Sequence, residues 1–245
     1  WYNLDRRKKE RMKILMKNKL QEILKERDTH PVNSKEWNAL NEKKADLLEE
    51  MKPSTKEEII TFYEKDLDYI EEGFTLTSRI PEIPFHSDRR ALLEHHPLMR
   101  HPIPYCIVRY ENKYFFILRE SGSGEIRLIG KKGMIGGHVG IEDMTDDLET
   151  TMLSGLMREV KEEAYEIINN LESAFLKGII KSNEGVDADH LGLVYEIIVT
   201  TDKIDSTEED KLTGIWIEKE DIENHKDQLE SWARIVYENV IKNDQ

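Results

Sequence analysis

The 245-residue sequence predicts an α/β sandwich preceded by a helical extension. Three observations lead to this prediction. Apolar residues recur at helical spacing near the start of the chain, β-branched and apolar runs of strand length follow from Tyr105, and an amphipathic segment from about 226 to 241 closes the chain. Strands, a helix, further strands and a last helix are typical of a sheet covered by helices.

Residues 1–75 are expected to form the helical extension. Met12, Leu15, Met16, Leu20, Ile23 and Leu24 follow helical spacing, and a break at 28–31 follows them. Asn33 or Ser34 is placed to cap a second helix, and the two helices predict an antiparallel hairpin with a narrow apolar seam. Pro53-Ser54, with acidic residues close behind, predicts a third helix over about 55–72 that ends at Gly73.

The first 30 residues are basic, whereas the chain as a whole has a net charge of −14. They carry ten Lys or Arg residues against five acids. The overall charge argues against general nucleic-acid binding, although the basic helix leaves a contact with RNA open. A narrow apolar seam is more often a packing surface, so we expect a homodimer.

Residues 76–104 are expected to connect the extension to the second domain, which spans 76–245. This segment is rich in proline and histidine, with a short helix expected around 89–94. His86, His95, His96 and His101 match no strong zinc-ligand spacing, and no cysteine lies near them, so the segment alone predicts no zinc site.

From Tyr105 onward the pattern indicates strands. Two of them, 105–110 and 113–119, flank the short turn Glu111-Asn112 and predict a hairpin. After the flexible loop 121–124, four more strands are expected at 125–129, 176–181, 190–200 and 212–217. The glycine-rich stretch 130–140 has neither the Walker nor the G-x-G-x-x-G spacing, so a P-loop and a Rossmann fingerprint are excluded.

The single cysteine, Cys106, cannot form an internal disulfide and lies in an apolar run typical of a core strand. No secretory signal is visible, and no apolar run approaches the roughly 20 residues that span a membrane. We therefore expect no membrane segment and a reducing, cytoplasmic location.

The segment from about Thr150 to Ile168 is expected to form a helix with acids along one edge of its apolar face. Glu159, Glu162, Glu163 and Glu166 fall within an arc of roughly 100° on such a helix. Like charges at this spacing repel one another, and a hard divalent cation such as Mg²⁺ would compensate them. An acidic run alone is more often a solvated face.

The combination with Gly136-Gly137-His138-Val139 makes the metal hypothesis stronger. Together with Arg158-Glu159-Val160-Lys161-Glu162-Glu163 it resembles the signature of the Nudix hydrolases, G-x5-E-x7-R-E-U-x-E-E-x-G-U, where U is a bulky aliphatic residue. The resemblance covers about residues 100–245 and implies an α/β/α sandwich with a mixed sheet. It also implies that Glu159, Glu162 and Glu163 bind Mg²⁺ or Mn²⁺, that Arg158 orients carboxylates, and that Gly136 and Gly137 lie on the cofactor-binding side of the site.

The chain departs from this pattern at two places. Seven additional residues separate Gly137 from Arg158, and the first glutamate of the pattern corresponds either to Glu142 or to Glu149. Tyr165 stands where the family has a glycine, so the helix is expected to continue to Asn169-Asn170, with Glu166 exposed.

The function implied by the resemblance is hydrolysis of a nucleoside diphosphate linked to another group, by water activated on the metal. Glu184, in the loop 183–187, is a candidate general base. Two alternatives remain open: a Nudix-fold module that binds a nucleotide or a partner without hydrolysis, and an enzyme that processes RNA ends with the basic first helix holding the strand.

Overall fold

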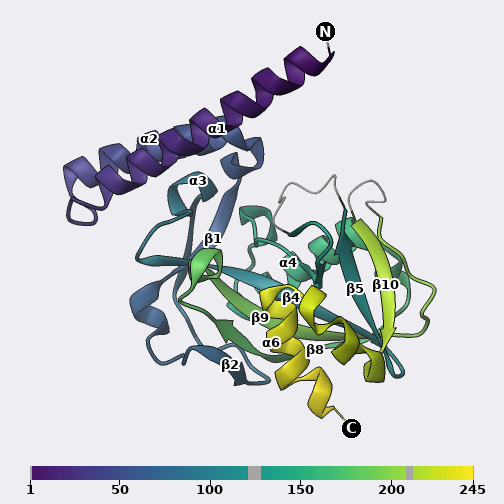
Figure 1. The fold of residues 1–245 in the computed structure, drawn as a ribbon. Helices are drawn as coiled ribbons and strands as arrows, with labels where there is room; N and C mark the ends of the chain where they lie inside the picture. The colour runs from purple at the N-terminus through teal and green to yellow at the C-terminus, as the bar shows by residue number, and fades with distance from the viewer. Residues whose placement is uncertain (1, 121–127, 208–211, 245) are drawn as a thin grey trace. The chain divides into compact units, whose positions relative to one another are not determined.

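A computed structural model describes residues 2–120, 128–207 and 212–244 (Figure 1). The chain divides into two compact units, Trp1–Ile59 with Ser87–His96, and Ile60–His86 with Pro97–Gln245. The division therefore lies earlier than the expected boundary at residues 75 and 76, and the segment 87–96 belongs with the N-terminal helices. In the described part of the chain, no helix has the length and apolar character needed to cross a membrane.

The first unit contains the two expected long helices, α1 (Tyr2–Arg27) and α2 (Lys35–Met51), which lie side by side (Figure 1). Ser34 caps α2, because its hydroxyl accepts a hydrogen bond from the Trp37 N–H at 3.2 Å. The short helices η1 (Pro53–Lys56) and α3 (Arg90–Leu93) complete this unit, and α3 confirms the short helix expected near Arg89.

Two buried cations organise the core of the first unit. Lys44 Nζ donates to the carbonyls of Leu92 at 3.0 Å and Glu94 at 2.6 Å, at the C-terminal end of α3. Carbonyls at a helix end need donors, and a cation is favourable there. Arg27 donates to the Asn41 side chain at 3.1 Å, and its guanidinium lies 5.0 Å from the centre of the Trp37 ring.

The expected third helix over 55–72 is wrong. This segment forms strand β1 (Glu58–Tyr63) and a single turn η2 (Glu64–Leu67), and strand β2 (Gly73–Leu76) follows it. The four central residues of β1, Ile59 to Phe62, are β-branched or aromatic and are all buried. A run that is buried on both faces favours a strand within a sheet over an amphipathic helix.

The second unit is built on a mixed sheet with the strand order β10-β5-β4-β9-β8-β2. Strands β4 and β9 pair in parallel, and the other pairs along this order are antiparallel. The bounds of the remaining strands are β3 (Phe85–Arg89), β4 (Met99–Tyr110), β5 (Lys113–Arg119), β6 (Lys132–Gly133), β7 (Ile135–Gly136), β8 (Leu171–Lys181), β9 (His190–Val199) and β10 (Leu212–Glu218).

Helices cover both faces of this sheet, as α4 and α6 show in Figure 1. Side chains alternate across a strand, so Cys106 and Val108 join the core under α4, whereas Tyr105 and Ile107 join the core under α6. The bounds of the helices are α4 (Leu148–Glu163), α5 (Glu166–Asn169), α6 (Ser231–Asn239), and the short η4 (Ile141–Asp143), η5 (Gly185–Asp189), η6 (Lys219–Gln228) and η7 (Ile241–Asn243). The expected α/β/α sandwich with a mixed sheet is confirmed.

Most of the expected strands are present, with shifted ends. The strand expected at 125–129 lies mainly outside the described residues, and its described end, 128–129, is not in a strand. The expected helix over 226–241 is shorter, because η6 and an extended residue, Leu229, precede α6. Cys106 is fully buried in β4, and burial raises the pKa of its thiol, which agrees with a role in the core.

Candidate active site

Helix α4 carries the acidic motif. Asp147 caps it by accepting a hydrogen bond from the Thr150 N–H at 2.8 Å, and its buried face holds Met152, Leu156 and Val160. The helix ends at Glu163, because Ala164 leaves the helical conformation with φ −152° and ψ 72°. The expectation that it continues to Asn169-Asn170 is therefore wrong.

The segment around Thr207 supplies the physical reason for this early end. The Thr207 N–H donates to the Glu163 carbonyl at 2.7 Å, and the Thr207 hydroxyl accepts from the Tyr165 N–H at 3.0 Å. These bonds replace those that a continued helix would make. Tyr165 and Glu166 are both exposed, as expected for Glu166.

Arg158 is the organising cation of the motif. It donates to the Asp143 carboxylate, to Glu159 Oε1 at 2.8 Å and to the carbonyl of His138 at 2.7 Å. Burial alone would lower the pKa of Arg158, but Asp143 and Glu159 outweigh it and raise the pKa further above its ordinary value. Arg158 therefore ties α4 to the loop that follows β7.

Asp143 is the acidic partner that the sequence analysis missed. Its side chain is 4% exposed, and it also accepts a hydrogen bond from the Gly140 N–H at 2.9 Å. Of the two residues expected to stand for the first glutamate of the pattern, Glu142 is 62% exposed and 3.9 Å from Arg158, and Glu149 is exposed in the first turn of α4. The turn η4 turns Asp143 inward and Glu142 outward, and no spacing rule in the sequence reveals this.

The two glycines of the motif allow close approaches. A Cβ on Gly137 would lie 2.2–2.4 Å from the Glu159 carboxylate, so this carboxylate rests directly against the Gly137 backbone. Gly136 pairs with Tyr105 of β4, and a Cβ there would lie 2.7 Å from the Pro104 carbonyl oxygen. Gly137 thus positions Glu159, whereas Gly136 lets β7 pack against β4.

The three motif glutamates lie along one edge of α4, at i, i+3 and i+4. Glu159 is mostly buried; burial raises the pKa of its carboxyl, and the charges of Glu162 and Asp143 raise it further, against the opposing effect of Arg158. Glu162 is 60% exposed and lies 3.5 Å from Arg158. Glu163 is partly buried at the end of the helix.

A second charged pair, Arg119 with Glu230, is influenced by the charge of Glu163, and no local sequence pattern predicts it. Arg119 Nε donates to Glu230 Oε1 at 2.6 Å, across 111 residues of sequence. Burial lowers the pKa of the Arg119 guanidinium, but the charges of Glu230 and Glu163 outweigh it and raise the pKa. Glu230 is the residue immediately before α6, and its carbonyl accepts a hydrogen bond from the Arg234 N–H at 3.0 Å. Arg119 is thus a cation, fixed by Glu230, that feels the charge of Glu163.

Glu184, the candidate general base, lies in the segment that joins β8 to β9 rather than on α4. It is exposed in the turn between β8 and β9, and its N–H donates to the Ser182 hydroxyl at 3.2 Å. The neighbouring Asn183 bonds to Glu72 and Arg100 rather than to α4. The role of Glu184 as general base stays a prediction.

The acidic edge of α4 has the donor set of a hard divalent cation. Carboxylate oxygens suit Mg²⁺ and Mn²⁺. Burial, and to a lesser extent the charge of Glu162, raise the pKa of Glu159, and a bound cation would offset both effects. Glu159, Glu162 and Glu163 are the residues that could hold it.

Comparison with known proteins places the fold. No protein-family model matches the chain. The protein YmaB of Bacillus subtilis (strain 168) is 24% identical over 200 residues, which cover 74% of this chain and 96% of YmaB. Among solved structures, Tm1382, described as a Nudix hydrolase, matches with a TM-score of 0.61 and 21% identity over 76% of this chain and 99% of its own. A NUDIX-family hydrolase from Clostridium perfringens matches with a TM-score of 0.38 and 16% identity, over 58% of this chain and 97% of its own.

The likeness to Tm1382 confirms the resemblance at the level of the fold. The chain has the Nudix fold, with additional N-terminal helices, and its R-E-x-x-E-E sequence lies on the helix that covers one face of the mixed sheet.

Proposed function

We propose that this protein is a metal-dependent Nudix-type hydrolase that cleaves the pyrophosphate bond of a nucleoside diphosphate linked to another group. The observation that carries the proposal is the set of Glu159, Glu162 and Glu163 on one edge of α4. Arg158 pairs with Glu159 and Glu162, and Glu159 rests against Gly137. The Nudix fold raises the expectation of this activity, but fold alone does not fix function.

The chain's own residues have distinct tasks in this proposal. The three glutamates bind Mg²⁺ or Mn²⁺, which when bound neutralises the diphosphate and lowers the pKa of a water molecule. Arg158 fixes the Glu159 carboxylate through its 2.8 Å hydrogen bond, so that the ligand set is held before substrate arrives. We assign the proton acceptor to a motif carboxylate, with Glu184, which is exposed between β8 and β9, as the alternative.

Charge raises a difficulty for an anionic substrate, because the chain has a net charge of −14. A bound cation would reverse the local field on the acidic edge. Arg119 is the protein group that we expect to help, since it lies within the electrostatic reach of Glu163 and is already ordered by Glu230.

The test is a panel of nucleoside diphosphate derivatives incubated with Mg²⁺ or Mn²⁺. Wild type should release a nucleoside monophosphate, and Glu162→Gln or Glu163→Gln should lower kcat by at least about a hundredfold with an unchanged melting temperature. Glu166→Gln is the matched control, because Glu166 is an exposed acid just beyond α4 and should keep wild-type turnover.

The outcomes separate the alternatives. Metal binding without turnover on any substrate would replace the enzyme by a nucleotide-binding module of the same fold. A Glu163→Gln protein that folds and turns over at the wild-type rate would overturn the assignment of the site.

We also propose that the protein forms a homodimer through α1. Met12 and Leu15 lie three residues apart on the same side of this helix and are 58% and 64% exposed, which is unfavourable for two large apolar side chains in a monomer. A second copy of the same helix offers a matching apolar surface, as in other isologous contacts.

A further inference from the structure

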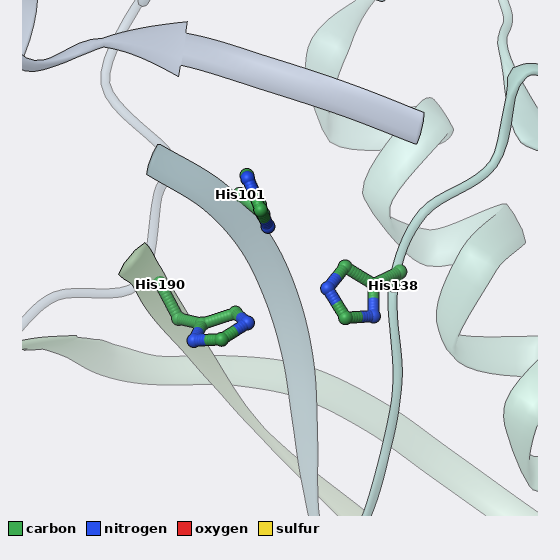
Figure 2. Close-up of side chains that lie close together, drawn as sticks. All are labelled: His101, His138 and His190. Carbon is green, nitrogen blue, oxygen red and sulfur yellow. The ribbon is translucent and has the colours of Figure 1, made fainter. Parts of the chain in front are cut away.

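Three histidines from distant parts of the sequence meet at one end of the mixed sheet (Figure 2). His101 lies on β4, His138 in the loop after β7, and His190 at the first position of β9. His101 and His190 are direct neighbours in the parallel pairing of β4 with β9. One ring nitrogen of each histidine lies within 4.8 Å of the others.

The rings converge rather than stack. Their centroids are 5.3–5.4 Å apart, with interplanar angles of 50–87°, so that ring edges, where the nitrogens lie, face a common space. His101 is fully buried, and the other two are partly buried. Simple aromatic packing would account for the ring distances, but it does not require three nitrogens to approach a common point.

We propose that His101, His138 and His190 bind a divalent transition-metal ion, for which Zn²⁺ is the best fit. Imidazole nitrogens suit Zn²⁺, whereas Mg²⁺ and Mn²⁺ prefer the oxygens of the acidic edge, so the two sites would be chemically distinct. Three histidines leave the fourth tetrahedral position for water or an anionic group.

The geometry needs only a small contraction to hold the ion. Zn–N bonds of about 2.0–2.1 Å place tetrahedral nitrogens roughly 3.4 Å apart, compared with the 4.8 Å limit of this cluster. His138 lies in a loop rather than on a strand, so rotation of its side chain and a small shift of the loop supply this closure.

The site would act on the hydrolytic motif through the His138 backbone. The carbonyl of His138 accepts a hydrogen bond from Arg158 at 2.7 Å, and the preceding Gly137 lies against the Glu159 carboxylate. An ion that fixes the His138 ring would therefore fix the loop that supports both residues. His138 is thus a positioning residue for the acidic edge.

The experiment is titration of the metal-free, full-length protein with Co²⁺, followed by competition with Zn²⁺. Co²⁺ in a four-coordinate histidine site gives intense visible bands, whereas Co²⁺ among carboxylates and waters gives weak ones. Wild type should show the intense bands at one ion per chain and lose them when Zn²⁺ is added. The double variant Glu162→Gln/Glu163→Gln should keep them, which separates this site from the proposed hydrolytic one.

His138→Gln and His190→Gln should each weaken Co²⁺ and Zn²⁺ binding by more than about tenfold, since even residues that only support ligands contribute 10–100-fold. His225→Gln is the matched control, because His225 is partly buried on η6 and outside the cluster. Unchanged binding in both cluster variants, or wild type without intense bands, would overturn the proposal.

X-ray absorption of the Zn²⁺-loaded wild type decides the question even if a variant fails to fold. Three imidazole ligands at about 2.0–2.1 Å are expected. A shell made mainly of oxygen ligands would reject the histidine site.

Discussion

Arg158 and Asp143 form a two-pronged ion pair, in which Nε lies 3.1 Å from Oδ1 and Nη2 lies 2.9 Å from Oδ2. The pair joins α4 to η4, across 15 residues of sequence. Because such paired bonds fix the plane of a guanidinium, they also aim the remaining Arg158 donors at Glu159 and at the His138 carbonyl. Asp143 thus orients Arg158, which in turn orients the Glu159 carboxylate of the motif.

Asp143→Asn should destabilise the protein and impair its activity. The variant leaves Arg158 without its buried carboxylate, which we expect to lower the free energy of unfolding by about 2 kcal/mol, because Arg158 is partly exposed. Urea unfolding measures this change, and metal-dependent kcat should fall as Glu159 loses its orientation.

Glu142→Gln is the control for this prediction, since Glu142 neighbours Asp143 but lies 3.9 Å from Arg158 and is largely exposed. It should change stability by less than about 0.5 kcal/mol. Equal effects of the two substitutions would show that the Arg158–Asp143 pair has no special role.

His96 should make the first unit sensitive to acid. Burial, reinforced by the charges of Lys44 and Arg27, lowers the pKa of His96 to about 4, compared with about 6.5 in an unfolded chain. The folded state therefore resists protonation, and stability that is present above pH 6.5 is lost as the pH falls towards 4.

The measurement is the free energy of unfolding at pH 7 and pH 5, for wild type and His96→Gln. Wild type should lose about 2 kcal/mol more than the variant over this interval, from 1.36 kcal/mol for each pKa unit. The same loss in both proteins would exclude His96 as the acid-sensitive group.

Local patterns in the sequence predict the helices and strands that depend on residues close together along the chain. The hairpin of β4 and β5 follows from two apolar runs around Glu111-Asn112, and α4 follows from apolar residues at helical spacing. The sequence predicts a helix at β1 because Ser54, with acidic residues shortly after it, matches the start of a helix. The strand forms instead because β1 is buried within the sheet, which depends on residues distant in sequence.

The rest of the site depends on pairs that are distant in sequence. The Arg119–Glu230 ion pair spans 111 residues, and His101 meets His190 only through the parallel pairing of β4 with β9. The role of Asp143 was not predicted, because the Nudix signature places a glutamate, at a different distance in sequence from Arg158. In each case the residues carry no local signal of their partner.

Leu15→Glu should convert the proposed dimer to a monomer. A carboxylate on the exposed apolar patch of α1 would have to be desolvated in the contact, which is unfavourable. Sedimentation equilibrium measures the mass, with Lys17→Gln as the control, because it changes the charge by the same amount without removing an apolar side chain. A wild-type protein that sediments as a monomer at all concentrations contradicts the dimer.

Gly137→Ala should impair metal binding and turnover more than it impairs stability. The new Cβ would lie 2.2–2.4 Å from the Glu159 carboxylate, so the carboxylate must retreat by about 1 Å to reach ordinary contact distance. It is the end of a flexible side chain, so the fold should adjust at a small energetic cost, whereas a ligand displaced by this distance binds the ion poorly.

Gly140→Ala provides a matched control, because its Cβ would meet the carboxylate of Glu142 at 2.3–2.4 Å. Both substitutions push a carboxylate away from a glycine, but Glu142 is exposed and stands outside the proposed ligand set. We expect Mg²⁺ affinity and kcat to fall in Gly137→Ala alone, with similar melting temperatures in both variants. If Gly137→Ala retains wild-type kcat and Mg²⁺ affinity, the position of Glu159 against Gly137 is not required for the reaction.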